Sequence, residues 1–137
     1  YIGQDGKDHT PIMIHRTIFG SLERFCTILI EHYAGAFPFW LSPIQIKIIS
    51  VSDNHIDYCY KLSEEFLQMD FRPQVDDASE TVGNKIRKAV NEKVPYILVI
   101  GDKEMESGLL NVRERGSKNT YKISKEDFIK NIQSQIK

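Results

Sequence analysis

The sequence predicts an α/β protein whose larger part is a mixed five-stranded sheet flanked by three helices. Three observations lead to this prediction. An unbroken apolar run at Tyr96–Ile100 is typical of a central strand that is covered on both faces. Before it, strand-like and helix-like segments alternate, an order that favours crossover units and a mostly parallel sheet. After it, a turn at Ser107–Gly108 brings another strand alongside, which makes one edge antiparallel.

The expected elements follow in chain order. A short apolar strand at 11–14 precedes a helix from Leu22 to about Tyr33, whose apolar residues recur at i, i+3, i+4 and i+7. The aromatic stretch bracketed by Pro38 and Pro43 is expected to be an ordered linker, because proline moves the preceding residue out of helical space. The later segments are strands at 44–51, 71–75, 96–100, 109–113 and 118–123, and helices at 53–69, 81–91 and 124–136.

The chain is expected to divide into residues 1–42 and residues 43–137. A lone strand and helix cannot bury their apolar faces, so residues 1–42 are interpreted as the end of a larger domain that continues before Tyr1, followed by the linker. Residues 43–137 hold all the remaining strands and helices, and are expected to form a domain of their own.

Composition favours a soluble globular class, with 41% hydrophobic and 27% charged residues. No apolar run approaches the roughly 20 residues of a membrane helix, so no membrane association is expected. Cys26 and Cys59 fall on apolar faces of the expected helices. Buried free thiols in a reducing, cytoplasmic setting are favoured over a disulfide.

Charge is unevenly distributed, although the net charge is only −1. Residues 1–84 carry six Lys or Arg against twelve Asp or Glu, whereas residues 85–137 carry twelve against seven. A basic half of this kind is what a phosphate-binding surface would show, and it raises the odds of RNA binding modestly.

The stretch His15–Phe25, HRTIFGSLERF, carries the strongest functional signal. Gly20 leaves room for a ligand because it has no Cβ, and Arg24 presents a planar fork of donors suited to phosphate. This strand, Gly-Ser turn and helix with an early arginine resembles motif 3 of the class II aminoacyl-tRNA synthetases. His15 narrows the resemblance to the threonyl-tRNA synthetases, and the likeness extends over essentially the whole chain.

In that family the arginine contacts ATP phosphate, and the histidine is one of three protein ligands of a zinc ion that recognises threonine. The resemblance therefore implies that Arg24 and Ser21 bind ATP or the adenylate, with magnesium, and that His15 binds zinc. Without the resemblance, the residue types favour His15 as a core histidine whose hydrogen bonds are satisfied, and Arg24 as a solvated arginine paired with Glu23 or Glu31. The other zinc ligands and motif 2 would lie upstream, so this chain alone is expected to be inactive and to hold zinc weakly or not at all.

Residues 43–137 are similar to the anticodon-binding domain shared by the threonyl, prolyl, histidyl and glycyl synthetases. The resemblance implies that Glu104 and Arg113 read the anticodon of tRNA(Thr), with the arginine on the middle G and the carboxylate on the final U. Arg113 is expected to approach the same edge of the sheet as Glu104. The alternative is an exposed ion pair between Arg113 and Glu104 or Glu114. Ser79 stands where the family usually has an asparagine that contacts the anticodon. Lys93 stands where the family often has an arginine.

The segment Gly83-x-Lys85-Ile86-Arg87 matches the family pattern GxKIR. Lys85 and Arg87 are candidates for contacts to the RNA backbone, and a solvated helix face is the equal alternative. The resemblance as a whole implies the C-terminal part of a family member. Such an enzyme joins threonine to its tRNA with ATP, dimerises in its full-length form, and uses this part to bind the anticodon stem-loop.

Two other interpretations are open. One is a stand-alone tRNA-binding accessory protein or paralogue without ligase activity, and the other is a small-ligand-binding α/β domain of similar shape. The stretch around His15 argues against both, because neither would need it.

Overall fold

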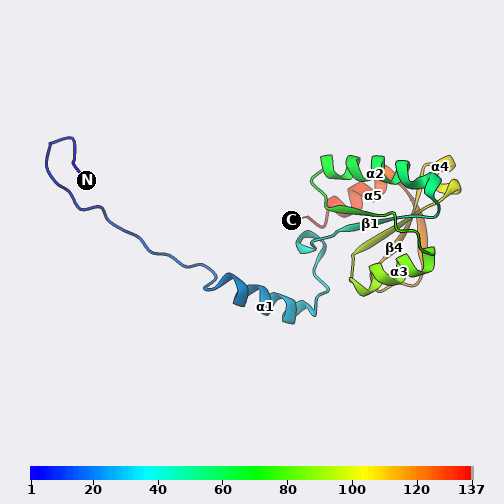
Figure 1. Cartoon of the computed structure of the whole chain (residues 1–137), viewed down its shortest axis with the longest axis horizontal. Coiled ribbons are helices and arrows are strands. Elements are labelled where there is room, and N and C mark those ends of the chain that lie inside the picture. The colour runs from blue at the N-terminus through cyan, green and yellow to red at the C-terminus, as the bar shows by residue number, and fades with distance from the viewer. Residues whose placement is uncertain (137) are drawn as a thin grey trace.

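A mixed five-stranded sheet forms the centre of the structure, a computed structural model that describes residues 1–136 (Figure 1). The strands are β1 (Ile46–Ser50), β2 (Pro73–Asp76), β3 (Tyr96–Ile100), β4 (Leu109–Glu114) and β5 (Thr120–Ser124). Their order across the sheet is β2-β1-β3-β4-β5. Strands β2, β1 and β3 are parallel, whereas β4 is antiparallel to both β3 and β5. The predicted mixed sheet is therefore confirmed, with the apolar run as its central strand.

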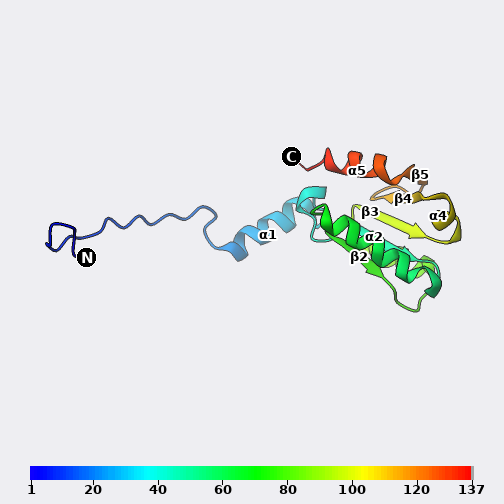
Figure 2. The same cartoon turned by 90° about the horizontal axis from the view of Figure 1, so that it is seen from above.

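Helices cover both faces of the sheet. Helices α2 (Ile56–Gln68) and α5 (Lys125–Gln133) lie on one face, and α3 (Val82–Asn91) lies on the other (Figures 1 and 2). Two serines start helices as their sequence context predicts: Ser52 opens the 3-10 turn before α2, and Ser124 Oγ accepts a hydrogen bond from the Asp127 N–H at 3.1 Å. Ile136, which the predicted helix at 124–136 includes, is exposed beyond the end of α5.

A fourth helix in this part of the chain, α4 (Asp102–Ser107), corrects the predicted number of three. The sequence pattern predicts a loop after β3. A helix of six residues is too short to show a helical period in the sequence. Glu104 at the third position accepts a hydrogen bond from the Gly101 N–H at 3.2 Å, which stabilises the first turn. Gly108 ends the helix with a left-handed φ of 66°.

The core lies mainly between the sheet and the pair α2 and α5. Phe66, Phe71 and Phe128 are its largest fully buried side chains, and they pack in edge-on pairs. A smaller cluster under α3 consists of Ile49, Ala89 and Ile97. Strands β1, β3 and β4 contain buried apolar residues, whereas β2 and β5 contribute the partly buried Val75 and Ile123 to the edge of the larger cluster.

The N-terminal arm, residues 1–36, extends away from the sheet (Figure 1). Helix α1 (Leu22–Tyr33) forms where the periodicity predicts it, but none of its residues is buried. The strand predicted at 11–14 does not form, and Ile12 and Ile14 are exposed. A strand needs a neighbour for its backbone hydrogen bonds, and the described residues provide none for this segment.

The linker between arm and sheet is ordered, as predicted, and also contains a 3-10 turn at Phe39–Leu41. Phe39 is buried against the rings of Phe71 and Tyr96. The buried Gln45 side chain donates to the Phe39 carbonyl at 3.0 Å and accepts from the Arg72 N–H at 2.9 Å. The linker is thus fixed to the first strand of the sheet.

Within residues 1–136, no helix has the length and apolar character required to cross a membrane.

The two cysteines are free and differ in exposure. Cys59 is fully buried, and burial raises the pKa of its thiol to about 11. Cys26, predicted to be buried, is exposed because α1 has no packing partner among the described residues.

We expect a thiol reagent near neutral pH to label Cys26 alone in the folded chain and both cysteines in urea, as measured by mass spectrometry of the peptides. Rapid labelling of Cys59 without urea would contradict this structure.

Candidate nucleic-acid interface

The carboxyl ends of the parallel strands bring two predicted site residues to one end of the sheet, which is where sheets of this type bind ligands. The loop 77–80 leaves β2 there and carries the exposed Ser79. Helix α4 leaves β3 there and carries Glu104. Val51, the residue after β1, lines the same hollow as Ser79, and its N–H donates to the carbonyl of Ile100 at 3.0 Å. Val51 therefore lies between the loop and the end of β3.

Glu104 is more enclosed than its position in the sequence predicts. The residue is only 9% exposed. One carboxylate oxygen, Oε2, accepts the Gly101 N–H, and the other, Oε1, lies 3.8 Å from Nζ of Lys122. A base N–H that approaches Oε1 would therefore compete with the lysine.

The structure does not place Arg113 beside Glu104. Strand β4 runs antiparallel to β3, so Arg113 pairs with Ile97 near the start of β3, whereas Glu104 follows Ile100 at its end. Three residues of strand span about 10 Å. Arg113 forms no ion pair within the described residues, and its Nε donates to the Ser117 carbonyl at 3.0 Å. The expected approach to one common edge is therefore wrong, as is the alternative of an exposed ion pair.

Asn111 and Lys122, which the sequence reasoning missed, lie between Arg113 and Glu104. Asn111 pairs with Lys122, and Arg113 pairs with Thr120, so the four side chains share one face of the sheet. All four are exposed or half-buried, and we call them the open face. The alternation of apolar and polar residues over 110–113 contained the signal for Asn111, because it places Asn111 and Arg113 on the same side.

The two predicted RNA-backbone contacts on α3 have different surroundings. Lys85 is 4% exposed, and its ammonium donates to the Ser50 carbonyl, to Ser50 Oγ and to the Asp76 carbonyl, each at 3.2 Å. Arg87 is exposed and donates to Asn84 Oδ1 at 2.8 Å. A phosphate contact does not fit Lys85, because its charged group points into the molecule, whereas Arg87 lies at the surface.

Lys93 lies at the opposite end of the sheet from Ser79 and Glu104, just before β3. Its ammonium donates to the carbonyl of Ala34 at the end of α1. Arg115 Nη1 donates to the Lys93 carbonyl at 3.0 Å and to the Phe37 carbonyl at 2.8 Å. Lys93 therefore contacts the end of the arm, and the structure does not bring it together with the other predicted anticodon residues.

A buried histidine that the sequence reasoning missed supports α4. His55 Nδ1 accepts a hydrogen bond from the Ser52 N–H at 3.2 Å, so its proton lies on Nε2, which is 2.9 Å from Asp102 Oδ1. His55 is buried, and Asp102 is the first residue of α4. The contact ties the loop after β1 to the helix that carries Glu104. Only the spacing of Ser52 and His55 at a helix start signals it in the sequence.

The predicted catalytic residues all lie on the arm. Ser21 Oγ accepts from the Arg24 N–H at 3.4 Å and donates to Glu23 Oε2 at 2.6 Å, so Ser21 caps α1. Arg24 is exposed and forms no ion pair within residues 1–136. His15 is exposed, and the described part of the chain has no group of three His, Cys, Asp or Glu that could hold a metal. These residues alone do not fit a zinc centre.

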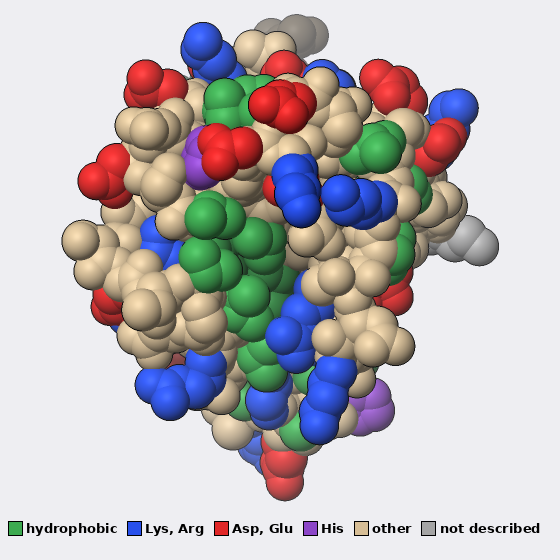
Figure 3. Space-filling view, turned by 90° about the vertical axis from the view of Figure 1, so that its right-hand side faces the viewer, with side chains coloured by type: hydrophobic (Ala, Val, Ile, Leu, Met, Phe, Trp, Pro, Cys, Tyr) green, Lys and Arg blue, Asp and Glu red, His purple; other side chains and the backbone are tan. Residues whose placement is uncertain are grey.

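The surface at the α4 end of the molecule combines apolar and cationic groups. Figure 3 shows a strip of hydrophobic side chains with several Lys and Arg side chains beside and below it, and acidic side chains above. Apolar surface suits the faces of unpaired bases, and neighbouring cations suit phosphates. The arrangement is chemically suited to single-stranded RNA.

Comparison with known proteins places this domain in a family. Residues 45–135 match the family model described as an anticodon binding domain, so the chain belongs to the anticodon-binding domain family. The solved RNA binding domain of threonyl-tRNA synthetase from Cryptosporidium parvum Iowa II superposes with a TM-score of 0.79 at 29% identity, covering 85% of this chain and 29% of that one.

The chain is also similar to curated threonine--tRNA ligases. The chain is 49% identical over 136 residues to a threonine--tRNA ligase of Desulforamulus reducens, covering 99% of this chain and 21% of that protein. It is equally identical over 137 residues to a threonine--tRNA ligase of Clostridium botulinum, covering all of this chain and 22% of the relative. The chain thus spans about a fifth of the length of these curated relatives.

Proposed function

We propose that this chain is part of an enzyme that joins threonine to tRNA in an ATP-dependent reaction, and that residues 43–137 bind the anticodon stem-loop. The 49% identity to threonine--tRNA ligases carries the proposal, because it extends over the arm as well as the sheet domain. A stand-alone RNA-binding protein would leave the apolar residues of the arm in water, including Ile12, Ile14 and Leu22, all of which are exposed.

The arm would complete the catalytic domain of that enzyme. Arg24 would contact ATP phosphate together with magnesium, Ser21 would lie against the adenylate, and His15 would be one of three zinc ligands. The remaining ligands and the ATP-binding residues would come from other parts of the enzyme, so the chain alone would not form the adenylate. A homodimer in the cytoplasm is the proposed form of the whole enzyme.

The separation of Arg113 and Glu104 supports reading of two different bases. A single base cannot reach two groups about 10 Å apart along a strand, whereas the splayed bases of an RNA loop can occupy separate positions. The Arg113 fork suits the O6 and N7 edge of the middle G, and Glu104 Oε1 can accept from the N–H of the final U. Ser79, exposed at the same end as Glu104, would contact a further base.

Titration of the chain with a tRNA(Thr) anticodon stem-loop tests the proposal. We expect micromolar binding that weakens as salt rises, because counterions are released from the RNA. A hairpin of equal length and charge with an unrelated loop should bind more weakly at every salt concentration. Equal binding of the two hairpins would refute base recognition by this domain.

A further inference from the structure

Lys85 has its hydrogen-bonding capacity filled inside the protein. An ammonium group has three donors, and Lys85 Nζ has three acceptors at 3.2 Å: the Ser50 carbonyl, Ser50 Oγ and the Asp76 carbonyl. The residue is nine-tenths buried or more, although it lies on the first turns of a surface helix. Its role is therefore internal.

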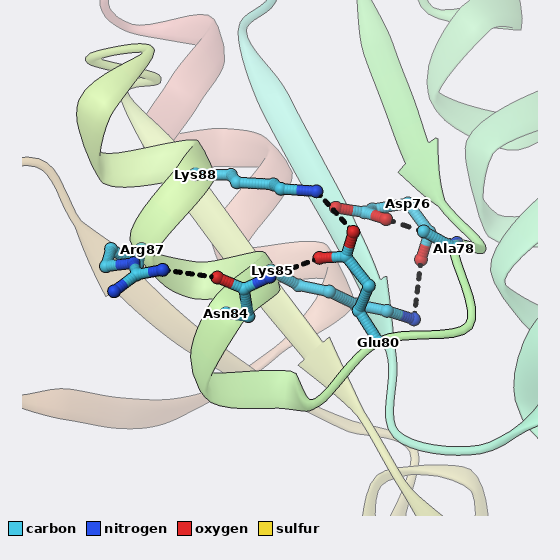
Figure 4. A network of polar contacts seen from close by, with 7 residues as sticks. All are labelled: Asp76, Ala78, Glu80, Asn84, Lys85, Arg87 and Lys88. Atoms are coloured by element: carbon cyan, nitrogen blue, oxygen red, sulfur yellow. Dashed lines mark hydrogen bonds and ion pairs between the residues drawn. The ribbon is translucent and has the colours of Figure 1, made fainter.

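The acceptors of Lys85 lie at the point where the loop 77–80 leaves the sheet. Ser50 is the last residue of β1 and Asp76 is the last residue of β2, so one ammonium joins both strands to α3. The Asp76 side chain in turn accepts from the Ala78 N–H at 3.3 Å (Figure 4). Lys85 thereby fixes the start of the loop that carries Ser79.

The other end of the loop is held at the surface. Glu80 Oε1 accepts from Lys88 Nζ, and Glu80 Oε2 accepts from Asn84 Nδ2, each at 2.5 Å (Figure 4). The hydrogen bond from Lys88 is the main cause that lowers the pKa of the Glu80 carboxyl below its usual value, so Glu80 stays ionised at neutral pH. Between these two attachments, Ser79 is exposed.

We propose that Lys85 is a positioning residue for RNA recognition, which holds the loop 77–80 so that Ser79 faces a base, and which does not touch RNA itself. The inference rests on the proposed function and assigns to Lys85 a task different from that of a phosphate contact. Glu80 performs the complementary task at the other end of the loop. Preorganisation of this loop reduces the ordering that RNA binding would otherwise cost.

Salt dependence distinguishes positioning from phosphate contact. Loss of a phosphate-contacting cation reduces the slope of log affinity against log salt by about 1. We expect Lys85→Met to weaken stem-loop binding about 10-fold while leaving this slope at the wild-type value, an affinity change that corresponds to about 1.4 kcal/mol. Arg87→Met removes an exposed cation from the same helix and controls for the loss of general positive charge.

Base selectivity provides the second measurement. Stem-loops substituted in turn at each anticodon position should show that Lys85→Met and Ser79→Ala lose discrimination at the same position. In a double-mutant cycle, Lys85→Met should cost no more than about 2-fold in the Ser79→Ala background, because the two act as one unit. Lys85→Met in an Arg113→Lys background should keep its full effect.

A further variant, Glu80→Ala, leaves the core intact. Lys85→Met removes a buried group, so its folded fraction is checked by circular dichroism and urea titration before binding is measured. Glu80→Ala releases the loop from the surface side and removes a negative charge, which alone would strengthen RNA binding. We expect Glu80→Ala to lose the same base discrimination as Ser79→Ala.

The outcomes separate the two levels of the proposal. If the wild-type chain does not prefer the anticodon stem-loop over the unrelated hairpin, both the proposed function and this inference fail. If the preference holds but Lys85→Met lowers the salt slope, or weakens all stem-loops equally with no coupling to Ser79, the positioning role alone is overturned. Unchanged discrimination in folded Glu80→Ala would also overturn it.

Discussion

Replacement of Phe66 by alanine is expected to lower the free energy of unfolding by about 3–5 kcal/mol. Phe66 has no exposed surface and joins three parts of the fold. Its ring centroid lies 6.2 Å from that of Phe71 before β2 and 6.0 Å from that of Phe128 on α5, both in edge-on geometry. Truncation removes both contacts and leaves a cavity, because α2 and α5 are both held in place by other core residues.

Urea unfolding followed by circular dichroism measures this change, and Leu67→Ala provides a matched control on the same helix. Leu67 is 56% exposed, and its truncation is expected to change stability by no more than about 0.5 kcal/mol. Equal losses from the two substitutions would contradict the packing of α2 against the sheet. Phe66→Leu, which retains most of the buried volume, should fall between the two.

The sheet domain could be predicted because its local signals agree with the packing. The apolar run 96–100 is long enough for a buried strand and too short for a helix, and the structure places it at the centre of the sheet. Ser52 and Ser124 start helices because their side chains accept backbone N–H groups that have no helical partner. These features depend only on neighbouring residues, which the sequence supplies directly.

Features that depend on distant partners were not predictable in the same way. The segment 11–14 has the composition of a strand, but a strand forms only where another strand pairs with it, and the sequence does not show whether one is present. Lys85 appears on a helix that is otherwise rich in exposed polar residues, and only the tertiary structure reveals that Ser50 and Asp76 surround its ammonium.

The candidate site shows the same division. The family pattern identified Ser79, Glu104 and Arg113, but the relative positions of the last two depend on strand direction. The sequence predicts the antiparallel direction of β4, and that direction alone places Arg113 near the start of β3, so the expectation of one common edge conflicted with the predicted topology. The burial of Glu104 follows from its cap on α4, a helix that the periodicity of the sequence does not reveal.

Replacement of Arg113 by alanine is expected to weaken binding of the anticodon stem-loop by about 1–3 kcal/mol, the range for loss of one bidentate base contact. Only Nε of Arg113 has a partner among the described residues, the Ser117 carbonyl. That contact fixes the side chain on the open face and leaves both terminal nitrogens of the fork for the O6 and N7 edge of a guanine. Titration with the wild-type stem-loop, and with one in which the middle G is replaced, measures the effect.

The losses of binding free energy from Arg113→Ala and from replacement of the middle G should not add, because each change removes the same contact. Arg113→Ala should therefore bind both stem-loops equally. Arg113→Lys retains the positive charge but loses the planar fork, so it should keep the salt dependence of the wild type while losing the preference for G. If Arg113→Lys still prefers the middle G, the fork does not read that base, and Arg113 acts through its charge alone. If Arg113→Ala keeps the preference, another residue of the open face reads it, and Asn111 is the neighbouring residue of β4 on that face.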